Sequence, residues 1–287
     1  MKTILVTGGN GQLGRCFRDI ALDQDEYHFI FVDVEELDIT KKDQILNYFT
    51  KNSISYCLNC AAYTAVDKAE SDPLLASAIN EKGAENLAIV CNEFDATLIH
   101  ISTDFVFSGN KNCPYVESDE PDPINVYGQT KWKGEQAVIS NVSNHLIIRT
   151  SWLYSEYGHN FLKTMLRLAT HNPHVAVVND QKGTPTYARD LAKCIFRIVS
   201  EKNQNFGVYH YSNEGEATWF DFAQEIFVVA NKAINLRPIT SEDYPTPAKR
   251  PKYSVLDKSK IKNTFKIDIP YWGEALKECL SRLGQQV

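Results

Sequence analysis

A tyrosine and a lysine four residues apart, Tyr127 and Lys131, are the residues in this chain whose types and spacing could do proton chemistry. On a helix, side chains four residues apart share one face, one turn apart. A free tyrosine has a pKa of about 10, and a neighbouring ammonium favours the phenolate. We therefore expect Lys131 to lower the pKa of Tyr127, by about three units for roughly 4 kcal/mol of interaction. The alternative, a surface tyrosine packed on a lysine stem, is not excluded by so short a motif.

A glycine-rich turn near the N-terminus predicts a dinucleotide site. The apolar run at residues 3–7 reads as a strand buried on both faces, and a helical stretch begins at Gln12. Between them the glycines Gly8, Gly11 and Gly14 give G-x-x-G-x-x-G rather than G-x-G-x-x-G. Strand, glycine turn and helix is the arrangement in which amide groups at a helix N-terminus meet a pyrophosphate. An ordinary glycine-rich turn is the alternative.

A carboxylate ends the next predicted strand, residues 29–33. Asp33 lies 19 residues after Gly14, which suits a hydrogen bond to the adenosine ribose. Such a contact favours NADH over NADPH. A solvated loop carboxylate is the alternative.

Hydroxyl side chains end the predicted strand at residues 97–102. Ligands of an open parallel sheet bind at the carboxyl ends of its strands, so we expect Ser102 and Thr103 to point a hydroxyl into the cleft. One loop separates Thr103 from Tyr127. Hydroxyl, phenol and the Lys131 ammonium could therefore converge.

The alternation of elements predicts an α/β fold. Five strand-like runs alternate with helical ones in the first 150 residues, at 3–7, 29–33, 56–60, 97–102 and 145–150. This pattern indicates a doubly wound parallel Rossmann sheet. Residues 151–287 have a looser pattern, and we expect a smaller C-terminal α+β substrate domain there, interleaved with segments that return to the first domain, residues 1–150.

Composition restricts the partners that this chain could take. The 287 residues are 43% hydrophobic and carry a net charge of −6, without a long basic stripe, so we expect no nucleic-acid partner. No apolar run approaches the ~18 residues of a membrane span and no signal peptide is evident. Seven scattered cysteines then indicate a cytoplasmic protein with reduced thiols. Cys57 and Cys60 form a Cys-x-x-Cys without a second pair, so we expect no metal.

Several longer motifs carry a resemblance to a known family. They are Thr-Gly-Gly-Asn-Gly-Gln-Leu-Gly at 7–14, Ala-Tyr-Thr-Ala-Val-Asp-Lys-Ala-Glu at 62–70, Ser-Thr-Asp-Phe-Val-Phe at 102–107, Tyr-Gly-Gln-Thr-Lys at 127–131, Arg-Thr-Ser-Trp at 149–152, Asn-Asp-Gln-Lys-Gly-Thr-Pro-Thr at 179–186 and Pro-Thr-Pro-Ala-Lys-Arg-Pro at 245–251. With them the chain resembles the extended short-chain dehydrogenases/reductases. Within that superfamily it is similar to the branch that reduces the C4 keto group of dTDP-4-dehydro-L-rhamnose with NADPH or NADH.

The resemblance implies a role for each matching residue. Thr103 would bind the substrate carbonyl, Tyr127 would be the general acid, and Lys131 would bind the nicotinamide ribose and activate Tyr127. The implied cofactor-binding residues are Gly8, Gly11, Gln12, Leu13, Gly14, Asp33, Asp38, Ile39, Ala62, Tyr63, Thr64 and Ser102, besides Tyr127 and Lys131. The implied contacts to the sugar come from Thr103, Asp104 and Trp152.

Departures from the family pattern leave alternatives open. Phe105 stands where a tyrosine is usual in the family. Some relatives hold a metal between two subunits through acidic residues, and Arg15 and Arg189 stand near the corresponding positions here. We therefore leave a homodimer open and expect no bridging metal. A 4-epimerase or 4,6-dehydratase is one alternative, although dehydratases carry Asp-Glu where this chain has Asp104 and Phe105. A non-catalytic protein similar to the regulatory subunit of methionine adenosyltransferase is the other.

Overall fold

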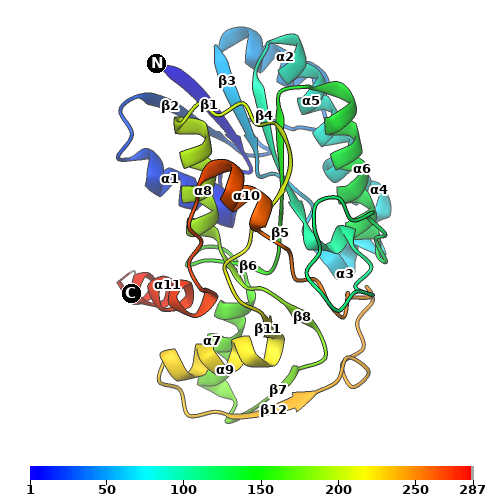
Figure 1. Ribbon diagram of the computed structural model, residues 1–287, viewed down its shortest axis with the longest axis vertical. Helices are drawn as coiled ribbons and strands as arrows, with labels where there is room; N and C mark the ends of the chain where they lie inside the picture. The colour runs from blue at the N-terminus through cyan, green and yellow to red at the C-terminus, as the bar shows by residue number, and fades with distance from the viewer. Residues whose placement is uncertain (286–287) are drawn as a thin grey trace.

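A six-stranded parallel sheet forms the centre of the chain in the computed structural model, which describes residues 1–285 (Figure 1). Its strand order is β10-β5-β4-β3-β1-β2. The strands are β1 (Lys2–Thr7), β2 (Tyr27–Val32), β3 (Ile54–Asn59), β4 (Thr97–Thr103), β5 (His145–Thr150) and β10 (Gly207–His210). All five neighbouring pairs are parallel, so their carboxyl ends lie along one edge of the sheet.

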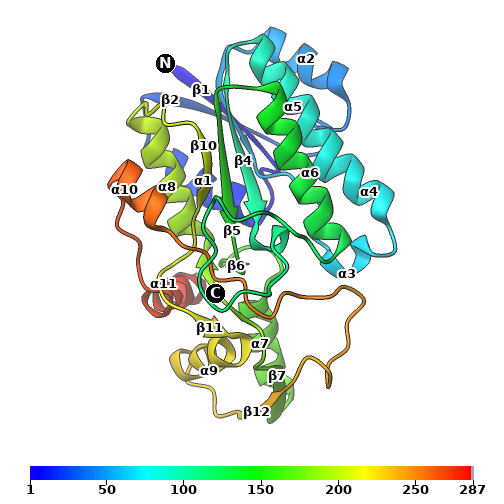
Figure 2. The ribbon, with the colours of Figure 1, turned by 45° about the vertical axis from the view of Figure 1, so that its right-hand side comes forward.

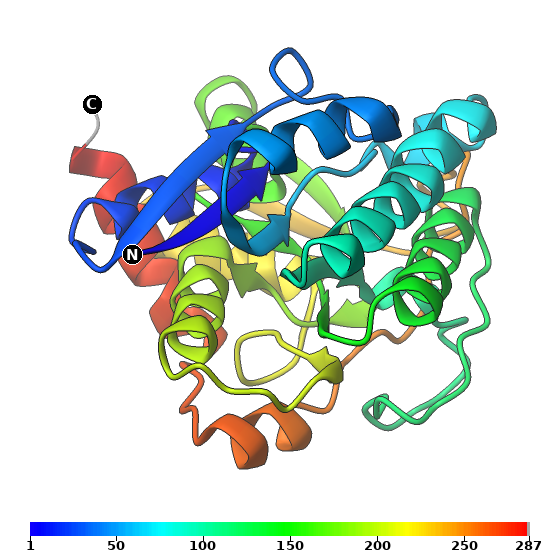
Figure 3. The ribbon, with the colours of Figure 1, turned by 90° about the horizontal axis from the view of Figure 1, so that it is seen from above.

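Helices cover both faces of this sheet, as Figure 3 shows from above. On one face lie α2 (Lys42–Lys51), α5 (Gly83–Glu93) and α6 (Val126–Asn141). On the other lie α1 (Gln12–Ala21), α8 (Ala188–Ser200) and α10 (Ser259–Phe265). The doubly wound fold expected from the sequence is confirmed.

Alternate residues of each strand explain this arrangement. Ile4 and Val6 pack into the core under α1 and α8, whereas Leu5 between them packs into the core under α2 and α5. Ile99 and Leu98 divide between the two cores in the same way. Because successive strand side chains point to opposite faces, a continuous apolar run is what a sheet buried on both sides requires.

The remaining elements either lie beside α6 or form a lower part below the sheet, as Figure 2 shows. The short helical segments are α3 (Val66–Ala69), α4 (Pro73–Ser77), the π-helical turn η1 (Ala78–Lys82) and the 3-10 turn η2 (Asp104–Val106). The lower part contains β6 (Leu153–Tyr154), α7 (Phe161–His171), β7 (His174–Val178), β8 (Lys182–Gly183), β9 (Thr186–Tyr187), β11 (Ala217–Thr218), α9 (Trp219–Val229), β12 (Asn235–Ile239) and α11 (Trp272–Gln285). Its own apolar core joins α7, α9 and α11.

The chain crosses between the two parts several times. After residue 150 it enters the lower part, returns to the sheet with α8 and β10, and returns again with α10. One strand of the six-stranded sheet, β10, comes from the C-terminal half and pairs with β5 at the sheet edge. A domain boundary at residue 150 stays a prediction.

Strand order fixes where a ligand can bind. The chain moves from β1 outward to β2 and then returns to the other side of β1 to form β3. A crevice opens outside the carboxyl ends of an open α/β sheet at such a reversal. The glycine turn after β1 and the small residues after β3 border this crevice.

Candidate active site

The glycine turn lies between β1 and α1 and leaves the start of α1 free for a ligand. Gly11 is the N-cap of α1 and no side chain caps the helix, so the first backbone N–H groups of the helix face the cleft. Gly8 has φ +63°, and a Cβ there would lie 2.8 Å from the backbone N of Ala61 at the end of β3. Only glycine allows this approach of β1 and β3 at the cleft floor.

The next strand ends beside this turn. The Asp33 carboxylate accepts hydrogen bonds from the backbone N of Asn10, 3.1 Å, and of Val34, 2.9 Å. Asp38 accepts from the Thr40 hydroxyl at 2.7 Å, and this bond lowers the pKa of the Asp38 carboxyl. Both carboxylates line the cleft together with Ile39. This end therefore has acceptors suited to ribose hydroxyls.

The loop after β3 is fixed by a side chain that the sequence analysis missed. Asn80 Oδ1 accepts from the backbone N of Tyr63 at 2.8 Å, and Asn80 Nδ2 donates to Tyr63 O and to Thr130 Oγ1, both at 3.1 Å. Ala62 and Thr64 line the cleft, but Tyr63 is not among its lining residues. Asn80 lies in the π-helical turn η1, a distortion frequent at functional sites, and could have been suspected only from the structure.

The two hydroxyls at the end of β4 point to different partners. The Ser102 hydroxyl donates to Glu135, and Glu135 forms an ion pair with Arg149 at 2.7 Å, with all three side chains buried. Thr103 Oγ1 donates to Asp104 Oδ1 at 3.1 Å and forms a hydrogen bond with Tyr127. The expectation that both hydroxyls point into the cleft is wrong for Ser102, because neighbouring strand residues face opposite sides of the sheet. Ser102 still lines the cleft.

Helix α6 brings Tyr127 against Thr103. Asn125 caps the helix by accepting from Gly128 N at 2.8 Å. A Cβ on Gly128 would lie 2.2 Å from Phe105 O, so glycine is what allows the helix to touch the end of β4. The Phe105 ring contacts the Tyr127 ring edge-on, with the centroids 5.6 Å apart. Thr103, Tyr127 and Lys131 all line one cleft, and their convergence on a substrate stays a prediction.

The pKa values of this pair differ from the expectation. Burial raises the pKa of Tyr127 to about 12, against the lowering effect of its hydrogen bond with Thr103. Burial lowers the pKa of Lys131 to about 8. Lys131 Nζ donates to the backbone O of Ile101 at 2.6 Å. The predicted lowering of the Tyr127 pKa is wrong, because desolvation of the phenolate and the nearby Asp104 charge raise it, and Lys131 is not among the groups that act on it.

Asp104 is an incompletely satisfied carboxylate in the same cleft. It is 1% exposed, and burial raises its pKa to about 6. Its Oδ2 has no hydrogen-bond partner within 3.5 Å among residues 1–285, Oδ1 accepts from the Thr103 hydroxyl, and the nearby Ser254 hydroxyl acts to lower the pKa of this carboxyl. A buried acceptor left open in a cleft suits a ligand hydroxyl.

Two stacked tryptophans form the opposite wall. Trp152 and Trp219 have ring centroids 3.6 Å apart and planes at 7°. Trp152 has φ +45°, which is strained for so large a residue. Gly183 packs so closely against the Trp152 ring that a Cβ on Gly183 would lie 2.6 Å from it. Trp219 Nε1 donates to Gln181 Oε1 at 3.2 Å. The sequence analysis identified Trp152 but not Trp219, which lies 67 residues further along the chain.

Two further residues of the cleft come from distant segments. Arg250 donates to both oxygens of Asp67, at 2.8 and 3.1 Å, and this bidentate pair lowers the pKa of Asp67. It places a guanidinium at the cleft from a loop of the C-terminal half. His159 lies in the loop before α7. Only Arg250 had a signal in the sequence, the Lys-Arg-Pro at 249–251.

Together these residues line one cleft of about 910 Å³. Of the site residues predicted from sequence, the structure places the following in its wall: Gly8, Gly11, Gln12, Leu13, Gly14, Asp33, Asp38, Ile39, Ala62, Thr64, Ser102, Thr103, Asp104, Tyr127, Lys131 and Trp152. The cleft joins an anion-binding helix N-terminus at one end to the Thr103–Tyr127 pair and the tryptophan wall at the other.

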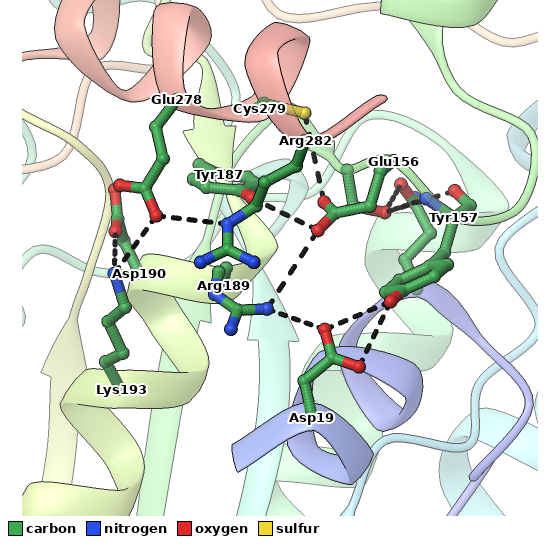
Figure 4. A network of polar contacts seen from close by, with 12 residues as sticks. Asp19, Glu156, Tyr157, Tyr187, Arg189, Asp190, Lys193, Glu278, Cys279 and Arg282 are labelled. Atoms are coloured by element: carbon green, nitrogen blue, oxygen red, sulfur yellow. Dashed lines mark hydrogen bonds and ion pairs between the residues drawn. The ribbon is translucent and has the colours of Figure 1, made fainter. Parts of the chain in front are cut away.

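A polar network fastens α1 to the C-terminal half (Figure 4). Arg189 pairs with Asp19 of α1 at 2.6 Å, and the Tyr157 hydroxyl donates to the same carboxylate at 3.0 Å. The Arg15 guanidinium lies over the Tyr157 ring, 4.2 Å from its centroid.

Within residues 1–285 no group of three or more His, Cys, Asp or Glu side chains could hold a metal ion. Among the same residues, no helix combines the length and the apolar character needed to cross a bilayer.

A parallel doubly wound sheet with a Tyr-x-x-x-Lys helix beside its cleft defines the class of extended short-chain dehydrogenases/reductases. A family model described as the RmlD substrate binding domain matches residues 1–285, and the chain belongs to that family. A dTDP-4-dehydrorhamnose reductase of Aggregatibacter actinomycetemcomitans is 40% identical over 287 aligned residues, covering 96% of this chain and 98% of the relative.

Solved structures agree with this assignment. The crystal structure of a dTDP-4-dehydrorhamnose reductase from Bacillus anthracis in complex with NADP superposes with a TM-score of 0.95 at 39% identity, over 98% of this chain and 100% of the other. A UDP-glucose 4-epimerase of Thermus thermophilus, at 18% identity and a TM-score of 0.84, shares the fold alone.

The residues present fit a nicotinamide dinucleotide. The close approach of Gly8 to Ala61 and the uncapped start of α1 form a cradle that a side chain would fill. Asp33 lies beside this cradle through its bond to Asn10 N. A pyrophosphate at the helix N-terminus and a ribose at the carboxylate match what such a cofactor presents.

Proposed function

We propose that this chain is an NAD(P)H-dependent oxidoreductase that reduces the C4 keto group of dTDP-4-dehydro-L-rhamnose to form dTDP-L-rhamnose. The observation that carries the proposal is the convergence of Thr103, Tyr127 and the buried Lys131 in a cleft whose far end is built for a dinucleotide. Relatives about 40% identical over nearly the whole chain support the substrate.

The glycine turn and the N-terminus of α1 would hold the pyrophosphate, and Asp33 the adenosine ribose. Lys131 would donate to the nicotinamide ribose hydroxyls. Reduced nicotinamide, when bound, supplies the hydride that reduces the carbonyl carbon.

The chain's own residues handle the proton. Tyr127 is protonated at neutral pH because its pKa is about 12, so it can donate a proton to the carbonyl oxygen as negative charge grows there. The Lys131 ammonium then stabilises the phenolate that remains. Thr103 would bind the carbonyl oxygen beside Tyr127, and Tyr127 would be the group that protonates it.

The substrate end has acceptors and a wall for the sugar nucleotide. The open Oδ2 of Asp104 would accept from a sugar hydroxyl, and Trp152 would pack against the sugar face. We assign the Arg250 guanidinium, which Asp67 holds at the cleft, to the diphosphate of the substrate, because its remaining N–H groups can donate to phosphate oxygens.

We further propose a cytoplasmic enzyme with a C-terminal substrate-binding part from residue 151 and a soluble nucleotide-sugar substrate, taking no nucleic-acid or membrane partner and able to form a homodimer. All seven cysteines are free, which suits a reducing compartment. Light scattering after gel filtration would measure the oligomeric state.

One assay separates this function from its alternatives. The purified chain is incubated with dTDP-4-dehydro-L-rhamnose and either NADPH or NADH, and oxidation of the cofactor is compared with product formed. A reductase consumes one cofactor per product. An epimerase or dehydratase would form product without net consumption, and a regulatory binding protein would form none; either result rejects the proposal.

A further inference from the structure

An arginine of α1 reaches back over the glycine turn to the adenosine end of the cleft. Arg18 Nε donates to the backbone O of Gly9 at 3.2 Å, and Arg18 Nη2 donates to Asn10 Oδ1 at 3.4 Å. The backbone N of Asn10 donates in turn to the Asp33 carboxylate, the group that would bind the adenosine ribose. The guanidinium and this carboxylate are therefore both bonded to Asn10, one through its side chain and one through its backbone.

Packing fixes the guanidinium in this place. It lies over the Phe31 ring of β2, with Cζ 4.5 Å from the ring centroid. Gly9, whose N–H donates to the Val32 carbonyl at the end of β2, leaves room for it, because a Cβ on Gly9 would lie 3.2 Å from Arg18 Nη2. An exposed arginine ordinarily samples many rotamers, but this one is held by a ring and by two acceptors. Its position beside the turn is therefore set before any ligand binds.

The guanidinium is an unneutralised cation in acidic surroundings. The loop at 33–38 carries four carboxylates, which on their own would repel a phosphate on the adenosine ribose. Lys41 in the same region is paired with Asp38 at 3.2 Å, whereas Arg18 has no ion-pair partner among residues 1–285. The positive charge of Arg18 is therefore available to an anion from outside the chain.

Arg18 also has donors left for such an anion. A guanidinium carries five N–H groups in a planar fork, and here the Gly9 carbonyl and the Asn10 side chain take only one from Nε and one from Nη2. Neighbouring N–H groups of a guanidinium match two oxygens of one phosphate. NADPH differs from NADH by one phosphate on the 2′ position of the adenosine ribose, which is the ribose that Asp33 would bind.

We propose that Arg18 binds the 2′-phosphate of NADPH, so that the chain accepts both reduced cofactors: Asp33 serves the free 2′-hydroxyl of NADH, and Arg18 serves the phosphate of NADPH. An arginine near the ribose carboxylate is the arrangement through which a Rossmann sheet accommodates a 2′-phosphate. The inference rests on the proposed function for the use of a nicotinamide cofactor. It deepens that function by naming the residue that determines cofactor choice.

The test compares two substitutions of Arg18 with one matched control, Arg15→Gln. Arg18→Gln removes the charge and keeps a donor, whereas Arg18→Lys keeps the charge without the planar fork. Arg15 is also an exposed arginine of α1 and also lies over an aromatic ring, but that ring, of Tyr157, belongs to the C-terminal half. Both glutamine variants therefore remove one positive charge from the same helix. Thermal melting confirms that each variant folds.

The direct measurement is isothermal titration calorimetry of the protein without substrate, with NADP⁺ and with NAD⁺, which differ only in the 2′-phosphate. In Arg18→Gln we expect the dissociation constant for NADP⁺ to rise on the order of tenfold, as for the loss of a charge-assisted hydrogen bond, and that for NAD⁺ to stay nearly unchanged. Arg18→Lys should recover part of this loss. In the reductase assay, the ratio of kcat/KM for NADPH to that for NADH should fall by the same factor in Arg18→Gln.

Three results would overturn the inference. An equal loss for NADP⁺ and NAD⁺ in Arg18→Gln would mean that Arg18 only shapes the glycine turn, and no loss would mean that the 2′-phosphate lies elsewhere. An equal change of the ratio in Arg15→Gln would mean that any charge on α1 has this effect. Failure of the proposed function is distinguishable, because the parent chain would then reduce no 4-keto sugar while the calorimetric difference between the Arg18 variants and the parent would still be present.

Discussion

Replacing Tyr127 by phenylalanine removes one hydroxyl from the proposed proton donor and little else. The ring keeps its edge-on contact with the Phe105 ring. The variant lacks the hydrogen bond between the Tyr127 hydroxyl and Thr103. We expect a loss of stability of about 1 kcal/mol, the usual contribution of one such bond. The variant should therefore fold and keep its cleft.

The expected effect on turnover is much larger. In the parent chain the Tyr127 phenol is protonated at any working pH, because burial raises its pKa to about 12. General acid catalysis contributes a factor of roughly 10² to 10⁴, or about 3–5 kcal/mol of the barrier. The Thr103 proton cannot replace the lost one without breaking its bond to Asp104. We expect kcat to fall at least a hundredfold with the affinity for the cofactor nearly unchanged.

The assay measures oxidation of reduced nicotinamide at saturating 4-keto sugar nucleotide, and titration of the cofactor's fluorescence measures its binding. Tyr209→Phe is the matched control, since the Tyr209 hydroxyl donates to the Asn205 carbonyl at the sheet edge and Tyr209 does not line the cleft. That control should retain parental turnover. A kcat for Tyr127→Phe within threefold of the parent would refute the assignment of Tyr127 as the acid.

Three other perturbations test separate parts of the site. If the Lys131 ammonium is required, kcat/KM should not change with pH below the Lys131 pKa of about 8 and should fall about tenfold per pH unit above it. A kcat/KM that stays constant up to about two pH units above that pKa would contradict this. Asp33→Asn keeps a hydrogen-bond acceptor for Asn10 N but removes a negative charge, so NADPH should gain roughly tenfold in kcat/KM relative to NADH, and an unchanged ratio would place the 2′-phosphate elsewhere. Gly128→Ala brings a Cβ within 2.2 Å of Phe105 O, so we expect a loss of about 1–3 kcal/mol in the free energy of unfolding together with reduced turnover, and a melting temperature equal to that of the parent would show that α6 can shift freely.

Local pattern was enough to predict the sheet and the cofactor end. The apolar runs, the glycine turn and Asp33 act within a few residues of one another, and β1, α1 and β2 follow one another along the chain. The predicted strand at 29–33 differs from β2 at both ends, since β2 begins at Tyr27 and ends at Val32, so that Asp33 begins the loop. Spacing alone also predicted that Tyr127 and Lys131 share a helix.

What the sequence did not predict depends on distant segments or on burial. Trp219 and Arg250 reach the cleft through the fold of the C-terminal half, and no spacing rule connects them to Tyr127. The direction of the Ser102 hydroxyl follows from Glu135, a partner that only the packing of α6 on β4 reveals. The raised pKa of Tyr127 follows from partial burial of the phenol in the folded cleft, whose extent the sequence does not carry.

The ion pair between Glu135 and Arg149 has a consequence for how this enzyme can change over time. Both side chains are nearly inaccessible, at 0% and 2%, and they lie directly behind the proton-transfer residues. Replacing either partner alone would leave the other charge buried and unpaired, which lowers the free energy of unfolding by about 3–5 kcal/mol. The free energy of unfolding of a whole domain is only roughly 5–15 kcal/mol. Single exchanges at either position would therefore be eliminated, and descendants could replace this pair only by two nearly simultaneous mutations.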